Sequence, residues 1–297
     1  MRLAAIKPDD LAVVTDDGFI PVGDTLAQEG ALPRGASMID LITQYDSLKG
    51  SIASAIEKGS AIKLDPKQLR PPVERPSKIW AAAFNFRRGT EGLGDTGGRG
   101  EESQLTPEQI LEMTFLKPSS AVIGPEQAIL LPKGDRKVFP ELEVCIVIGK
   151  EARNLSKDQA LEAVFGYTVI LDMTSRGPNP PGMGMGSCRS VRKGFETFAP
   201  IGPWITTRDE IPDPQDLTMR LWINGDLIQS AKTSGMINGV ADLVSFLSEV
   251  TTLYPGDLIS TGNPDSPAFQ KQLKPGDILK AEIEKIGTLG LTVRNAD

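Results

Sequence analysis

The chain has 297 residues, of which 39% are hydrophobic and 24% charged, a composition typical of a globular protein. Its formal net charge of -7 argues against a nucleic-acid partner, because binding a phosphate backbone requires a basic surface. The chain contains no histidine, which excludes Ser-His-Asp and Cys-His nucleophile systems and zinc sites with histidine ligands. Any acid–base chemistry must therefore use carboxylates, lysine, tyrosine or metal-bound water.

The two cysteines, Cys145 and Cys188, are too few for a disulfide framework, and they fit a reducing cytoplasm. No apolar stretch approaches the roughly 20 residues that a membrane-spanning helix requires. We therefore predict a soluble, cytoplasmic protein with no membrane and no nucleic-acid partner.

Residues 1–70 are predicted to form a small N-terminal α/β domain. Two apolar runs flank Asp16-Asp17-Gly18, which is typical of a β-hairpin turn. Helical periodicity follows from Met38 to Ile56. Prolines then cluster around residues 71–77, a composition typical of a linker.

Residues 78–297 show many short strand patterns and a few helices. Helices are predicted from Thr106 to Met113, from a Ser156 capping box to Gly166, and over Gly239–Glu249. The predicted β elements are a strand over Ile79–Phe84, a strand over Tyr167–Leu171, a hairpin around Asn224-Gly225, and strands after the Pro-Gly-Asp turns at 255–257 and 275–277. This pattern predicts a β-rich α+β fold rather than a doubly wound sheet.

Glu141 and Glu143 open an apolar run that continues to Ile148. Alternate residues of a strand point to opposite faces, so the two carboxylates share one side. With Asp172, at the end of the next predicted strand, they could supply part of an oxygen-only site for Mg²⁺ or Mn²⁺, with Ca²⁺ as an alternative. The solvent-exposed face of an edge strand would also explain the Glu-x-Glu pair, and the residue pattern alone slightly favours it.

From Lys78 onward the chain resembles the fumarylacetoacetate hydrolase family. The matching runs, in chain order, are Phe115–Gly124, Glu141–Lys150, Gly166–Val169 with Asp172, Thr174 and Arg176, Lys193–Trp204, Thr261–Pro264 and Ile286–Leu289. The resemblance implies a mixed β-roll core over residues 78–297, a homodimer, and a metal held by Glu141, Glu143 and Asp172.

The resemblance also implies a substrate and a set of site residues. The family acts on 2-oxo and β-diketo acids, such as acylpyruvates and fumarylacetoacetate, most often by hydrolysis of a C–C bond, including in aromatic catabolism. A metal that chelates the 2-oxo acid stabilises the enolate left when that bond breaks. Lys193 is implied as a catalytic residue. The implied substrate-binding residues are Asn85, Phe86, Arg176, Thr197, Thr261 and Gly262. A surface ion pair for Lys193 or Arg176, or a plain turn at Thr261 and Gly262, is the competing interpretation.

The chain departs from the family pattern in the segment that follows Phe86. The family's hydrolases carry a water-activating His-Glu dyad there, and Gly89 and Gly92 occupy the two positions in this chain. Glu91 is the neighbouring carboxylate that could serve as a catalytic base, with Lys193 as the other candidate. The departure keeps isomerisation, decarboxylation and dehydration of a 2-oxo-3-deoxy sugar acid open as alternatives, together with a non-catalytic metal-binding protein.

Overall fold

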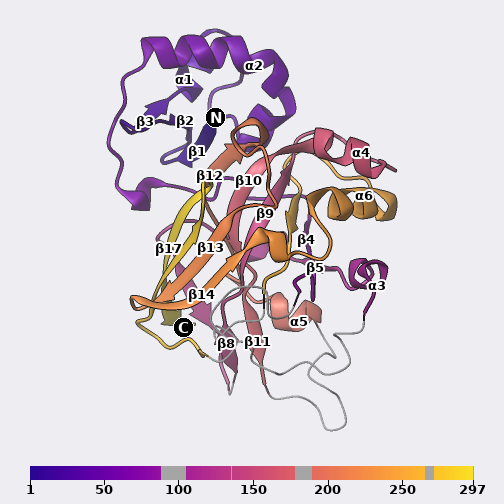
Figure 1. Ribbon diagram of the computed structural model, residues 1–297. Helices are drawn as coiled ribbons and strands as arrows, with labels where there is room; N and C mark the ends of the chain where they lie inside the picture. The colour runs from indigo at the N-terminus through magenta and orange to yellow at the C-terminus, as the bar shows by residue number, and fades with distance from the viewer. Residues whose placement is uncertain (88–104, 135, 178–188, 265–270, 297) are drawn as a thin grey trace.

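The computed structural model describes residues 1–87, 105–134, 136–177, 189–264 and 271–296. The fold is β-rich and of the α+β class, as the sequence predicts, with the helices at the ends and edges of the sheets (Figure 1). Its main sheet contains β1 (Arg2–Ile6), β2 (Asp10–Val14), β3 (Phe19–Pro21), β4 (Ile79–Ala81), β5 (Phe115–Lys117), β6 (Val122–Ile123), β9 (Leu142–Ile148), β10 (Val164–Leu171), β12 (Ala199–Thr207) and β15 (Leu258–Ser260).

Strands β9 and β10 form the centre of the main sheet, whose order is β3-β2-β1-β12-β10-β9-β15-β4-β5. All residues of both strands are buried. Their side chains alternate between two cores: Val144 and Ile146 pack in one apolar cluster, whereas Cys145 and Val147 pack in another. The alternation predicted for the Glu-x-Glu strand is therefore confirmed.

A second sheet packs beside the first in the order β14-β13-β16-β17-β7, and its hairpins confirm the predicted turns. Asn224 and Gly225 connect β13 to β14, both with positive φ. The Pro-Gly-Asp segments also precede strands, as predicted: the first precedes β15 of the main sheet and the second precedes β16 of this sheet. The strands of this sheet and of a small β8–β11 pair are β7 (Ala128–Leu131), β8 (Lys137–Phe139), β11 (Thr174–Arg176), β13 (Thr218–Ile223), β14 (Asp226–Lys232), β16 (Ile278–Ile283) and β17 (Gly287–Asn295).

Most of the predicted helices are confirmed. Two predicted boundaries are corrected, one of a helix and one of a strand. The α-helices are α1 (Gly23–Gln28), α2 (Met38–Lys58), α3 (Pro107–Leu111), α4 (Lys157–Ala160), α5 (Arg189–Lys193) and α6 (Val240–Val250). The helix opened by Ser156 ends at Ala160, not at Gly166, which lies in β10 where its backbone packs against that of Thr206. The predicted strand over Ile79–Phe84 ends at Ala81, and Phe84 has a left-handed φ of 60°, which a strand residue does not adopt.

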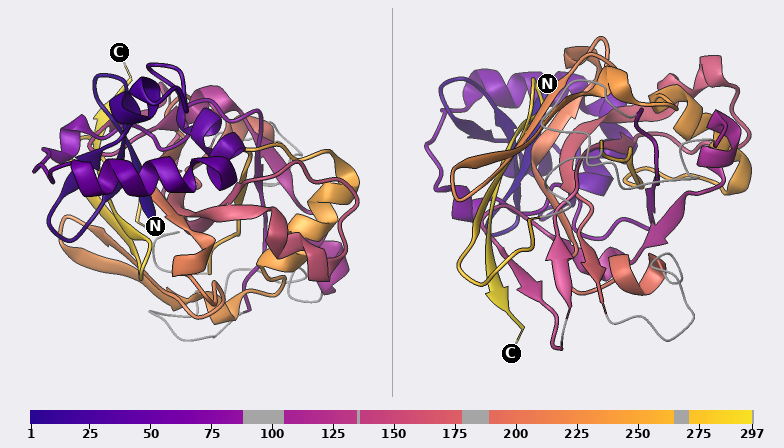
Figure 2. Two further views of the ribbon diagram at one scale, coloured as in Figure 1. Left: turned by 90° about the horizontal axis from the view of Figure 1, so that it is seen from above. Right: turned by 60° about the horizontal axis from the view of Figure 1, so that its bottom comes forward.

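The N-terminal strands continue the main sheet through the pairing of β1 with β12. Helix α2 lies across the upper end of the molecule (Figures 1 and 2), and its apolar face packs in the same cluster as Val147, Ile201 and Ile205 of the central strands. The division into a domain of residues 1–70, a linker of residues 71–77 and a domain of residues 78–297 stays a prediction. Within the described residues, no helix combines the length and the apolar character needed to cross a membrane.

Candidate metal centre and active site

The carboxylates of Glu141, Glu143 and Asp172 lie together at one end of β9 and β10. Glu141 directly precedes β9, and its carbonyl oxygen accepts a hydrogen bond from the backbone N–H of Asp172, which follows β10, at 2.8 Å. One ligand oxygen from each of the three residues lies within 4.8 Å of the others. Glu141 is 8% exposed and the other two are each 1% exposed, so the alternative of a solvent-exposed edge strand is wrong.

The end of β15 and the loop that follows it bind the Glu143 side chain. Oε2 of Glu143 accepts hydrogen bonds from the Ser260 hydroxyl at 2.5 Å and from the backbone N–H of Gly262 at 2.6 Å. Gly262 has a φ of +87°, and a Cβ there would lie 3.0 Å from that of Asn85. Burial, with the nearby charge of Asp172, raises the pKa of Glu143 well above its usual value. The free protein therefore holds this carboxylate at an electrostatic cost.

Lys193, at the last turn of α5, directs its ammonium group into the cluster. Its Nζ lies 2.6 Å from Glu141 Oε2, 2.6 Å from Asp172 Oδ2 and 3.1 Å from the Asp172 carbonyl oxygen. These three acceptors match the three N–H donors of an ammonium group. Burial alone would lower the pKa of Lys193, but the charges of Asp172 and Glu141 raise it above the usual value. In this arrangement Lys193 is a cationic donor.

Lys117 completes the cluster, and the sequence analysis assigned it no role. Its side chain is fully buried, and its Nζ lies 2.6 Å from Asp172 Oδ1 and 2.6 Å from the carbonyl oxygen of Lys193. Burial lowers the pKa of Lys117, whereas Lys117 and Lys193 together hold the pKa of Asp172 below its usual range against the effect of burial. The one available signal was its position in the matched run Phe115–Gly124.

The donor set of this cluster fits a hard divalent cation. Three carboxylates converge with oxygen atoms alone, which is the ligation that Mg²⁺, Mn²⁺ and Ca²⁺ prefer over zinc or copper. The buried position of the carboxylates and the raised pKa of Glu143 mean that a cation would relieve repulsion among them. Glu141, Glu143 and Asp172 are thus the residues that would hold it.

Three of the predicted substrate-binding residues lie beside Glu143 of this cluster: Asn85, Thr261 and Gly262. The Asn85 amide donates to the carbonyl oxygens of Asn238 and Thr261 at 2.9 and 2.8 Å, and its oxygen accepts from the N–H of Asn238. The Thr261 hydroxyl donates to the carbonyl oxygen of Val144 at 3.0 Å. These contacts fix the backbone beside Glu143, and direct substrate contact by these residues stays a prediction.

The other predicted residues lie around the cluster. Phe86 is buried and bridges to Met236. The Arg176 guanidinium stacks on the Phe139 ring at 4.8 Å, two residues before Glu141. The Thr197 hydroxyl accepts a hydrogen bond from the backbone N–H of Leu130 at 2.8 Å, with the Thr197 backbone at a φ of 68°.

Glu91, Gly89 and Gly92 lie outside the described residues. The prediction of Glu91 as a catalytic residue therefore has no structural counterpart and stays a prediction. The roles of Phe86, Arg176 and Thr197 in substrate binding also stay predictions.

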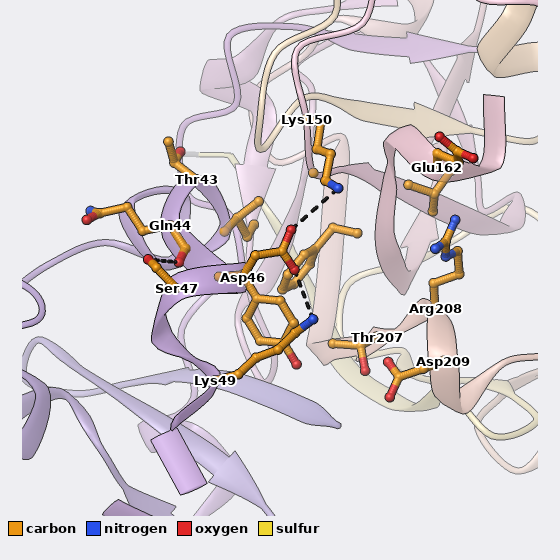
Figure 3. A pocket seen from close by; sticks show the side chains of 15 residues that line it. Thr43, Gln44, Asp46, Ser47, Lys49, Lys150, Glu162, Thr207, Arg208 and Asp209 are labelled. Carbon is orange, nitrogen blue, oxygen red and sulfur yellow. Dashed lines mark hydrogen bonds and ion pairs between the residues drawn. The ribbon is translucent and has the colours of Figure 1, made fainter. Parts of the chain in front are cut away.

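A cavity of about 480 Å³ lies at the opposite ends of β9 and β10, between α2 and the core (Figure 3). Lys49 and Lys150 both pair with the exposed Asp46 at its rim, at 2.9 and 3.4 Å. Arg208 and Glu162 lie on the facing wall. Exposed pairs of this kind contribute little to stability. The cavity contains none of the carboxylate cluster and is not the candidate active site.

Comparison with known proteins identifies the family to which this chain belongs. Residues 78–294 match the family model described as fumarylacetoacetate (FAA) hydrolase C-terminal. The chain belongs to the fumarylacetoacetate hydrolase family. The predicted resemblance is thus confirmed, and the matched range contains each residue of the carboxylate and lysine cluster.

Several relatives cover the chain well. A maleylpyruvate hydrolase from Aquipseudomonas alcaligenes is 36% identical over 99% of this chain and 100% of its own length. A 2,4-didehydro-3-deoxy-L-rhamnonate hydrolase from a Sphingomonas species is 42% identical over 73% of each chain. The crystal structure of maleylpyruvate hydrolase from Sphingobium sp. SYK-6, in complex with manganese(II) and pyruvate, superposes with a TM-score of 0.80 at 33% identity and covers 100% of both chains.

Proposed function

We propose that this protein is a metal-dependent hydrolase that cleaves a C–C bond of an acylpyruvate-like 2-oxo acid. The observation that carries the proposal is the buried cluster of Glu141, Glu143 and Asp172 with the Lys193 ammonium group among them. Relatives named as hydrolases of maleylpyruvate and of a didehydro-deoxy sugar acid, one with manganese and pyruvate bound, support both the reaction class and the divalent metal.

The reaction breaks the bond between the acyl carbon and the methylene carbon of the pyruvate unit. The oxygen of water bonds to the acyl carbon, the electron pair of the broken bond leaves with the pyruvate unit as an enolate, and the methylene carbon then takes a proton. A divalent cation, when bound, supplies Lewis-acid polarisation of the 2-oxo acid end of the substrate. The positive charge of Lys193, held against Glu141 and Asp172, would act through space to stabilise negative charge that develops on oxygen at that end.

Water activation is the step in which this chain departs from its family. We propose Glu91 as the base that takes the proton of water, because the chain has no histidine and the ammonium group of Lys193 is occupied by its three acceptors. Isomerisation, decarboxylation and dehydration need no attack by water at the acyl carbon, so they remain the competing reactions.

The finer properties of the enzyme follow from the donor set and the family. We propose Mg²⁺ or Mn²⁺ as the metal, since carboxylates alone suit both, with Ca²⁺ as a weaker alternative. We propose a homodimer in the cytoplasm that acts on small 2-oxo or diketo acids. The relatives that act on maleylpyruvate support a place in the breakdown of ring-opened aromatic compounds.

A substrate panel tests the proposal. The metal-loaded protein is incubated with acylpyruvates, oxaloacetate and 2-oxo-3-deoxy acids, and the products are identified by mass. We expect a carboxylic acid and pyruvate from an acylpyruvate. Products that are isomers of the substrate, or that have lost carbon dioxide or water, would favour the competing reactions. Absence of any product across the panel would favour a non-catalytic protein.

A further inference from the structure

Gln229, in the middle of β14, is a buried polar residue that connects the second sheet to the strand of the metal centre. Its side chain has no exposed surface. The Nε2 of Gln229 donates a hydrogen bond to the carbonyl oxygen of Leu142 at 3.3 Å. Leu142 is the residue between Glu141 and Glu143, so the contact reaches β9 where two of the three candidate metal ligands leave the backbone.

The Leu142 carbonyl lies at a place where the main sheet offers it no strand partner. Alternate carbonyl groups of a strand point to the same edge. The Val144 carbonyl binds the backbone N–H of Thr261 at 3.1 Å, just beyond β15, and the Leu142 carbonyl points to the same edge two residues earlier. The next residue of that loop, Gly262, directs its N–H to the Glu143 carboxylate instead. A buried carbonyl requires a donor, so here a side chain supplies it.

A β-bulge brings Gln229 to this position. Trp222 pairs with Leu227, but Leu221 pairs with Gln229, so Ile228 is an extra residue in the ladder. In a regular ladder Leu221 would pair with Ile228, and Gln229 would face the other side of the sheet. The bulge thus turns a glutamine inward where regular pairing would place an isoleucine. Bulges re-aim side chains in this way, often beside active sites.

The stability of the fold alone does not account for the inward glutamine. Its Oε1 is buried and has no hydrogen-bond partner among the described residues. An unpaired buried oxygen costs free energy, whereas an isoleucine in this place would bury apolar surface without that cost. What the glutamine adds is its N–H donor to Leu142.

This donor acts on Glu143 through the backbone. The Leu142 carbonyl belongs to the planar peptide unit that also contains the N–H of Glu143. A donor on that oxygen restrains the peptide plane, and with it the direction in which the Glu143 side chain leaves the strand. The carboxylate at the far end of the same side chain is bound by Ser260 and Gly262.

We infer that Gln229 is a positioning residue of the metal centre, which holds Glu143 in the orientation needed to bind a divalent cation. Hydrogen bonds one layer behind a metal ligand set its orientation and its affinity for the ion. The inference rests on the metal centre of the proposed function.

The experiment measures Mg²⁺ binding to Gln229→Met, which keeps an unbranched side chain of similar length and removes the donor. We expect calorimetry to show Mg²⁺ affinity about tenfold lower than in the wild type. The urea midpoint of the variant in chelator should change little, because the unpaired Oε1 is removed together with the donor. Gln229→Asn, whose amide is one methylene too short to reach Leu142, should weaken Mg²⁺ binding as well and replaces Gln229→Met if that variant does not fold.

Thr168→Val is the matched control. It removes another buried side-chain donor to a backbone carbonyl, that of Gly202 at 3.1 Å, from the neighbouring strand β10. Valine has nearly the same shape as threonine. This variant should lower the urea midpoint and leave the Mg²⁺ affinity unchanged.

Equal Mg²⁺ affinities in the wild type and Gln229→Met would overturn the inference. An equal loss in Gln229→Met and Thr168→Val would also overturn it, because both would then reflect general loosening of the sheets. If Gln229→Met weakens Mg²⁺ binding but the wild type turns over no acylpyruvate, the proposed reaction is wrong and the role of Gln229 stands. If acylpyruvates are hydrolysed and the affinities are equal, only the role of Gln229 is wrong. A wild type that binds no Mg²⁺ would overturn this role and the metal centre together.

Discussion

Lys117 and Lys193 bring two ammonium groups into contact with buried carboxylates, and each contact is 2.6 Å long. Burying such ions costs several kcal/mol each, and only close, hydrogen-bonded opposite charges offset that cost. Lys117 acts on the site through Asp172 and through the carbonyl oxygen of Lys193, so it is a positioning residue.

Substitution of Lys117 by methionine tests this role. The metal-free variant should lose about 3–5 kcal/mol of its free energy of unfolding, because the buried Asp172 carboxylate keeps only one of its two ammonium partners, Lys193. Saturating Mg²⁺ should restore part of the lost free energy of unfolding, since the bound cation would neutralise the Asp172 charge in place of Lys117. Urea unfolding with a chelator and with Mg²⁺ measures both values, and Lys280→Met, at an exposed pair, is the control. An equal loss with and without Mg²⁺ would contradict the account.

The contrast between Glu143 and Lys117 shows what the sequence could predict at the scale of residues. Strand alternation places Glu141 and Glu143 on one side and Asp172 ends the neighbouring strand, yet this pattern alone slightly favoured an exposed edge strand, and the family resemblance was needed to predict the triad. The role of Lys117 depends on a tertiary contact with a residue 55 positions later, and a lone lysine is usually an exposed one. Likewise, the hydrogen bonds of Asn85 to Asn238 and Thr261 leave no trace in local sequence.

The loop after β15 is the element that sets the orientation of Glu143. Ser260 ends the strand, and Gly262 turns with a positive φ so that its N–H points at the Glu143 carboxylate. Second-layer hydrogen bonds of this kind orient a metal ligand and tune its affinity. The precision of the metal centre therefore depends on a turn as well as on the ligands.

Gly262→Ala separates this positioning from ordinary backbone strain. Gly134 also has a positive φ, +89°, but nothing lies within 4 Å of a Cβ there, so Gly134→Ala reports the strain alone. We expect each alanine to cost about 1–2 kcal/mol of stability. Only Gly262→Ala should weaken Mg²⁺ binding, by about tenfold or more, because its Cβ would press on Asn85 and shift the loop. Equal metal affinities in both variants, measured by calorimetry, would argue against this role of the loop.

Element boundaries were less predictable than the elements themselves. The capping box at Ser156 opens a helix, as predicted, yet the helix stops at Ala160 because β10 begins at Val164, where it pairs with β9. The glycine at 166, which looked like a helix end, is needed instead where β10 approaches the backbone of Thr206. Tertiary pairing thus overrides a correct local signal.

At the scale of the whole molecule, the N-terminal elements and the strands that carry the metal centre share one apolar core. Leu3 in β1 is fully buried in the same cluster as Val147 of β9 and Ile201 and Ile205 of β12. The backbone pairing of β1 with β12 adds to this contact. The sequence indicated a separate small unit from its prolines and hairpin, but it could not reveal a sheet that crosses the expected boundary.

Leu3→Ala tests how tightly the two parts are coupled. The substitution should cost about 2–5 kcal/mol, as expected for a fully buried leucine. Trp204 contacts Phe19 of the N-terminal elements, so the measurement is made in a Trp204→Phe background, where Trp80 and Trp222 report on the part after residue 78. We expect tryptophan fluorescence and far-UV circular dichroism to shift together to lower urea concentration. An unchanged fluorescence midpoint would indicate independent units, and Ile62→Ala, at a half-exposed position, is the control.

The central claim is that the carboxylate and lysine cluster supports hydrolysis of a C–C bond, and the incorporation of solvent oxygen tests it most directly. The Mg²⁺-loaded protein turns over fumarylpyruvate in water enriched in oxygen-18, and mass spectrometry measures the label in the released fumarate. We predict one labelled oxygen per fumarate formed, and no turnover by Glu143→Gln, which removes a ligand charge. Turnover without label in the acid product, or full activity of Glu143→Gln, would contradict the account.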